Sequence, residues 1–173
     1  VLVGLFEFDL PAPNARFLVF VILGGISQIA GTALLLTLFD ARNFAVGTAY
    51  SKTETVQAAI FAIVFLGETI SLAATLGIFI SLIGVMIIST ARNPATFSST
   101  THPWLTRSAL VGLASGASFG IAAVSYRGAS LSLEGNGFLV QAAFTLALVL
   151  VLQTFMMAIY MALRNPGELR DAL

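Results

Sequence analysis

The sequence contains five runs of predominantly apolar residues, each near the roughly 20 residues that a helix needs to cross a bilayer. Arg16 and Asp40 flank the first run, and Pro94 and Pro166 follow the third and the fifth. Proline opposes helix continuation because it lacks a backbone N–H. The predicted spans cover about residues 17–39, 43–66, 71–89, 108–126 and 137–163. This pattern predicts an all-α membrane protein, a polytopic helical bundle.

The composition excludes a water-solvated surface. Hydrophobic residues make up 58% of the chain and charged residues 9%, whereas a soluble domain carries about 25% charge. Eight basic and eight acidic side chains give zero net charge, so no basic surface suited to nucleic acid is expected. Cysteine is absent, which removes disulfides and Cys-ligated metals.

The second run differs from the others because its continuous apolar part, residues 56–66, covers only about half a bilayer. Extending it back to Asn43 gives sufficient length, and this places Lys52 and Glu54 close to the middle of the membrane. A charge at the centre of a span costs about 2.5–3.5 kcal/mol on the insertion scale. Such residues normally face a water-filled cavity or a partner.

Helical spacing places Tyr50, Glu54, Gln57 and Phe61 on one stripe of this predicted helix. A stripe that mixes a carboxylate, an amide and aromatic rings indicates a cavity wall. Two interpretations of Glu54 stay open, a pathway-lining group or a member of a buried polar network. Lys52 falls on another face, where it either reaches toward an adjacent helix or extends to the nearer membrane interface.

Gln28 occupies the midpoint of the first run, beside Gly24 and Gly31. The glycines leave room next to the amide, so a substrate contact and an interhelical hydrogen bond are both compatible with the pattern.

The fourth run carries small residues at intervals of four, namely Ser108, Gly112, Gly116 and Gly120. In lipid, close backbone approach through small residues holds helices together. The stripe predicts either static packing or a flat face on which bundles slide during transport.

Catalytic motifs are absent from the sequence. The chain has a single histidine, His102, within the polar connection 96–107, so neither a histidine-rich metal site nor a Ser-His-Asp set is available. We therefore expect no enzyme activity, no cofactor and no metal.

A short motif joins the second and third runs. An apolar helix ends in Phe65-Leu66-Gly67-Glu68, a short Ser/Thr turn follows, and the next helix carries Gly77 and Gly84. This segment resembles the closing portion of an EamA repeat in the drug/metabolite transporter (DMT) superfamily. Gly67 is expected to close the first helix. Glu68 is expected near the N-terminus of the next one, as an architectural residue.

The resemblance implies ten spans in two inverted five-helix repeats. Residues 1–95 would form the end of the first repeat, 96–107 the loop between repeats, and 108–173 the start of the second. Two spans would then precede the chain and three would follow it. If the protein has these five spans alone, an antiparallel homodimer would be needed to supply both inverted halves.

Two features of the sequence predict opposite orientations of the chain in the membrane. Alternate loops place Arg16 and Arg127 on one side and five other arginines on the opposite side, which favours the second side as cytoplasmic. The plan of the family implies the reverse.

The resemblance implies a bacterial inner-membrane secondary transporter that moves a small metabolite, amino acid or drug-like solute by alternating access. In this reading Glu54 couples transport to a proton or cation, while Tyr50, Gln57 and Gln28 contact the substrate and Lys52 is a further candidate. The partners are the lipid bilayer and the small solute. The alternative is a membrane scaffold or subunit that transports nothing and whose polar residues are structural.

Overall fold

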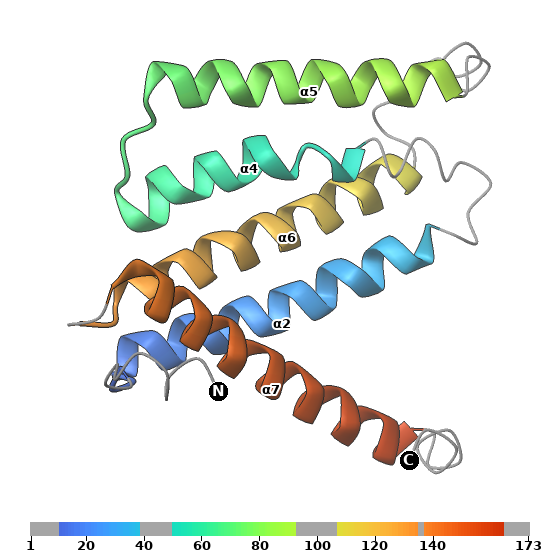
Figure 1. Cartoon of the computed structure of the whole chain (residues 1–173). Helices are drawn as coiled ribbons and strands as arrows, with labels where there is room; N and C mark the ends of the chain where they lie inside the picture. The colour runs from blue at the N-terminus through green and yellow to red at the C-terminus, as the bar shows by residue number, and fades with distance from the viewer. Residues whose placement is uncertain (1–10, 39–49, 93–106, 135–136, 165–173) are drawn as a thin grey trace. The chain divides into compact units, whose positions relative to one another are not determined.

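The computed structural model describes residues 11–38, 50–92, 107–134 and 137–164, and the regular structure in these ranges is helical throughout. The elements are α2 (Ala15–Thr37), α4 (Glu54–Phe61), the π-helical segment η1 (Ala62–Leu66), α5 (Leu72–Arg92), α6 (Arg107–Leu131) and α7 (Phe138–Arg164) (Figure 1). The prediction of an all-α chain is confirmed. Residues 43–49 of the second predicted span and 96–106 of the predicted loop lie outside the described residues.

Three of these helices have the length and apolar character needed to cross a membrane. They are α2 with 23 residues, α6 with 25 and α7 with 27. Glu54–Leu66 and Leu72–Gly84 are shorter apolar helical segments. The described part of the chain therefore has the helices of a membrane protein.

Helix α6 continues beyond the predicted end of the fourth span. Arg127 lies inside the helix, which ends only at Leu131. Arginine is a good helix former, and no proline occurs in this stretch. The end is closed by the backbone N–H of Ser132, which donates to the carbonyl of Gly128 at 3.1 Å.

The junction between η1 and α5 follows the predicted motif. Gly67 adopts a left-handed conformation (φ 67°) and closes η1, as expected. The N-terminus of α5 is capped by Ser71, whose Oγ accepts a hydrogen bond from the backbone N–H of Ala74 at 3.2 Å. Glu68 lies shortly before this cap, near the start of α5, and its own N–H donates to the carbonyl of Ala62.

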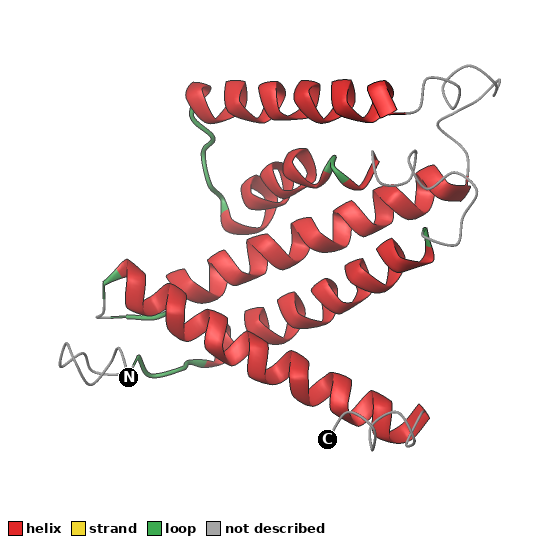
Figure 2. Ribbon diagram, turned by 45° about the vertical axis from the view of Figure 1, so that its right-hand side comes forward, coloured by secondary structure: helices red, strands yellow, loops and turns green. Residues whose placement is uncertain are grey.

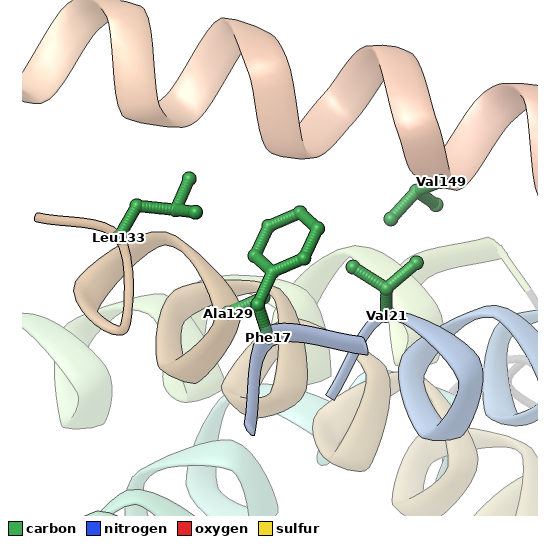
Figure 3. Close-up of a cluster of buried hydrophobic side chains, with 5 residues drawn as sticks. All are labelled: Phe17, Val21, Ala129, Leu133 and Val149. Atoms are coloured by element: carbon green, nitrogen blue, oxygen red, sulfur yellow. The ribbon is translucent and has the colours of Figure 1, made fainter. Parts of the chain in front are cut away.

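The chain divides into two compact units, and the division falls after Ile26 within α2 and after Val124 within α6. The first unit combines the start of α2, the end of α6 and α7. Its core is a cluster of side chains that point toward one another from these three segments (Figure 3), namely Phe17, Val21, Ala129, Leu133 and Val149. The Phe17 and Phe144 rings, 5.8 Å apart, extend this core along α7.

Asn14 ties the start of α2 to the end of α6 within this unit. Its Oδ1 accepts a hydrogen bond from the N–H of Phe17 at 2.8 Å, and its Nδ2 donates to the carbonyl of Ser132 at 2.6 Å.

Asn14→Ala removes both bonds, so we expect a loss of about 1–2 kcal/mol of stability. Asn14→Asp keeps the helix cap and loses only the donor, which gives a smaller loss. Thermal unfolding in detergent measures both. Equal midpoints for wild type and Asn14→Ala would contradict this role.

The second unit contains the rest of α2 and α6 together with α4, η1 and α5. Figures 1 and 2 both show α6 between α4 and α2, and α5 alongside α4. Helix α5 is apolar on nearly every side, and large exposed side chains such as Leu72, Phe79 and Ile80 run along it. Such an exposed apolar surface suits contact with lipid or with further helices.

Candidate functional site

The predicted helix over 43–66 is interrupted within its described part. Tyr50 and Ser51 are helical, Lys52 and Thr53 form a turn, and α4 starts at Glu54 with Thr53 as its N-cap. The N–H of Thr53 donates to the carbonyl of Tyr50 at 3.1 Å, a tighter i to i−3 bond than the α-helix makes. The helical stripe expected to join Tyr50 to Glu54 is therefore broken between them.

The Thr53 side chain stabilises this interruption. Its Oγ1 donates to the Tyr50 carbonyl at 2.7 Å, which gives that carbonyl a partner outside the regular helical ladder. Threonine competes with helical hydrogen bonding in this way. The same Oγ1 accepts a hydrogen bond from Nε2 of Gln57 at 2.8 Å. One hydroxyl thus connects the residues on both sides of the turn.

Two glycines of α6 lie directly against the interrupted helix. A Cβ atom at Gly116 would lie 2.8 Å from the Ser51 carbonyl oxygen and 3.3 Å from the backbone nitrogen of Glu54. At Gly120 it would lie 3.1 Å from the backbone nitrogen of Ala58. The glycine stripe that the sequence singled out therefore brings the α6 backbone against the turn and the first turns of α4.

Gln57 is incompletely satisfied at this contact. Its Nε2 donates to Thr53 and, at 3.5 Å, to the carbonyl of Leu113 in α6. Its Oε1 is buried and has no hydrogen-bond partner within the described residues. An unpaired buried acceptor costs about 1–3 kcal/mol. Native proteins retain such groups where a ligand or water supplies the missing bond.

The remaining candidates differ in exposure. Tyr50 is buried (6% exposed), Glu54 is half-buried at the first position of α4, and Lys52 is exposed in the turn. A carboxylate at a helix start is favoured by the helix dipole. Glu54 therefore occupies a helix terminus rather than the middle of a continuous helix, and Lys52 lies close to it in the sequence on the exposed side of the turn.

Gln28 lies on α2, which packs on α6 at Gly31. Ser115 donates through Oγ to the carbonyl of Gly31 at 2.9 Å, and the Phe119 ring lies 3.2 Å from the position of a Gly31 Cβ. Gln28 itself is half-buried, and its carbonyl accepts a hydrogen bond from the Thr32 hydroxyl. Four of the candidates thus lie in one segment that packs against α6, namely Tyr50, Lys52, Glu54 and Gln57. Gln28 lies on α2, which also packs against α6.

Sequence reasoning missed two residues that shape this region. Thr53 sets the turn, and Ser115, fully buried, fixes α2 to α6. Ser115 directly precedes Gly116, so the stripe of small residues on α6 indicated a close helix contact next to Ser115, although not Ser115 itself. Nothing in the local pattern distinguished Thr53 from Thr48 or Thr55.

The site offers a carboxylate, an amide with an unpaired oxygen, and an exposed ammonium around a helix start. These groups suit the binding of a proton, a cation or a small polar solute. Within the described ranges, no group of three or more His, Asp or Glu residues that could hold a metal ion occurs.

No model of a known protein family matches the chain, and neither a curated protein nor a solved structure matches it.

Proposed function

We propose that the chain belongs to an EamA-type secondary transporter of the drug/metabolite transporter superfamily, located in a bacterial inner membrane. It moves a small metabolite, amino acid or drug-like solute by alternating access, without chemical conversion. The motif Phe65-Leu66-Gly67-Glu68 and the glycines of α5 support the resemblance. The left-handed Gly67 that separates η1 from the loop before α5 supports it as well.

The observation that carries the proposal is the interruption at Lys52 and Thr53 beside the buried, unpaired Oε1 of Gln57. Within a bilayer, irregular backbone is tolerated only where it is buried in protein or lines a water-filled cavity. Interrupted helices are the usual place for substrate and coupling-ion sites in secondary transporters. Glu54 and Gln57 are the groups that bind at this interruption.

The depth of Glu54 agrees with this role. If Gly67 marks the membrane surface, Glu54 lies 13 residues earlier, about 20 Å deeper at 1.5 Å per residue. The hydrocarbon core is about 30 Å thick, so the carboxyl group lies inside the core, about 10 Å from its far surface. A charge at that depth needs water or a partner, which the cavity of a transporter supplies.

We further propose that the transporter has ten spans in two inverted repeats, and that this chain contains part of each repeat. In that arrangement α4 and α5 complete the first repeat, and α6 and α7 begin the second. The exposed apolar side chains along α5 support the presence of further covering helices.

The test is solute flux in proteoliposomes that contain the purified protein, with all the spans of both proposed repeats, and the internal pH dye pyranine. A panel of single amino acids is added outside, one at a time, under an imposed pH gradient. The proposal predicts that at least one solute shifts the internal pH beyond protein-free vesicles. A folded, reconstituted protein that moves no solute and no protons in this panel would favour the scaffold alternative.

A further inference from the structure

A cavity lies in the first unit, whereas the interrupted helix belongs to the second unit. It has a volume of about 270 Å³ and lies between the end of α6 and the first half of α7. Its walls are Tyr126, Arg127, Ser130, Leu131, Phe138, Gln141, Ala142, Thr145, Leu146 and Val149. Its size is close to the lower end of the range for ligand sites. None of the residues of the proposed transport site line this cavity.

Three of the polar side chains that line the cavity lie near the connection between α6 and α7, and Thr145 lies further along α7. Arg127 and Ser130 come from the last two turns of α6, and Gln141 comes from the first turn of α7. These turns border the short polar connection 132–137. An arginine close to the end of an apolar helix normally extends its guanidinium toward the headgroup region. The polar end of the cavity therefore faces the membrane interface.

The apolar part extends inward along α7. Ala142 and Val149 are 7 residues apart, about 10 Å along the helix. This is about a third of the thickness of the hydrocarbon core. Leu146 lies between them on the same wall, and Phe138 lies at the interfacial end. The cavity is thus shaped for a molecule with a polar head at the interface and an apolar chain below it.

The charge and hydrogen bonding of the lining select the headgroup. Arg127 is the charged residue among the lining residues, and it favours an anion. The Ser130 hydroxyl is buried and has no hydrogen-bond partner within the described residues. The side chains of Gln141 and Thr145 already donate to the carbonyls of Leu133 and Gln141. Ser130 is therefore the lining group in need of an acceptor, and a rotation about its χ1 angle directs the hydroxyl at a headgroup oxygen.

We propose that the cavity between α6 and α7 binds an amphiphile that has an anionic phosphate or carboxylate head and an apolar chain. Arg127 pairs with the head, Ser130 donates to it, and Phe138, Ala142, Leu146 and Val149 contact the chain. An anionic membrane lipid and a free fatty acid share this chemistry.

Lipid-dependent quenching of tryptophan fluorescence tests the proposal. The chain has a single tryptophan, Trp104, so the double variant Trp104→Phe/Phe138→Trp places the one indole at the cavity. The protein is reconstituted in phosphatidylcholine with increasing fractions of chain-brominated phosphatidylglycerol or chain-brominated phosphatidylcholine. A third arm adds bromodecanoic acid to vesicles without brominated lipid.

We expect the brominated phosphatidylglycerol to bind about fivefold better than the brominated phosphatidylcholine. Arg127→Gln removes the preference, and Ser130→Ala weakens it without lowering the thermal midpoint. Arg164→Gln, at the far end of α7, leaves it unchanged. Saturable, Arg127-dependent quenching in the bromodecanoic acid arm alone would identify a free amphiphile as the ligand.

Filling the cavity provides an independent check. Ala142 lines the cavity, whereas the adjacent Ala143 is exposed and does not line it. In the same reporter background, Ala142→Leu is expected to abolish the selective quenching and Ala143→Leu to preserve it. Equal quenching by both lipids together with no saturable quenching by bromodecanoic acid overturns the proposal, as does selectivity that survives Arg127→Gln.

Discussion

A Gly116→Ala chain is expected to unfold at a clearly lower temperature than wild type and to accumulate poorly in the membrane. The added methyl group would lie 2.8 Å from the Ser51 carbonyl oxygen and 3.3 Å from the Glu54 nitrogen. Both are backbone atoms, so no side-chain rotation relieves the contact. Overpacking of this kind costs about 1–3 kcal/mol, a large share of the stability of a typical domain. Thermal unfolding in detergent and membrane yield are the two measurements.

Gly77→Ala is the matched control for this change. Gly77 is also helical, in α5, and nothing lies within 4 Å of the position that its Cβ would take. The same methyl group is therefore expected to be neutral or stabilising by up to about 1 kcal/mol. If Gly116→Ala and Gly77→Ala have the same midpoint, then α6 does not pack closely on the turn before α4.

A Glu54→Gln chain is expected to fold and insert normally but to lose proton-coupled flux. The substitution keeps the shape of the side chain and removes its ionisable proton. Because Glu54 is only half-buried at the start of α4, an amide of the same shape is accommodated there. The pyranine signal in proteoliposomes should fall to the level of protein-free vesicles, while residual solute exchange becomes independent of pH.

Glu68→Gln serves as the control for Glu54→Gln. Glu68 is another half-buried glutamate, but it lies in the loop between η1 and α5 and outside the proposed site. Its substitution should leave the flux and its pH dependence unchanged. Wild-type flux with wild-type pH dependence in Glu54→Gln would remove Glu54 from the coupling role.

The helices could be predicted because run length and flanking residues are local properties. Four predicted spans each coincide with one helix, and the left-handed Gly67 closes η1 as the motif indicated. The motif placed Glu68 near the start of α5 but did not assign the N-cap. The cap is Ser71, whose hydroxyl accepts a hydrogen bond from the Ala74 N–H.

The interruption before α4 could not be predicted from local pattern. It depends on the Thr53 hydroxyl, which donates a hydrogen bond to the preceding Tyr50 carbonyl, and on Gly116, which lies 63 residues after Thr53 in the chain. Helical periodicity assumes a continuous helix, so it placed Tyr50 and Glu54 on one stripe. Within the described part of the chain, the side-chain oxygens of Gln57 and Ser130 have no hydrogen-bond partner, and this too is a property of packing between helices for which sequence spacing carries no signal.

The measurement that tests the central claim most directly is water accessibility around the interruption. The chain contains no cysteine, so each introduced cysteine is the single thiol. Thiols react with charged, membrane-impermeant maleimides only where water allows the thiolate to form. Lys52→Cys and Glu54→Cys are compared in native membranes with Val64→Cys, which lies on the exposed apolar surface of η1 (67% exposed). If the interruption lines a transport pathway, positions 52 and 54 react readily and position 64 does not. Reaction at 52 and 54 no faster than at 64 would contradict the account.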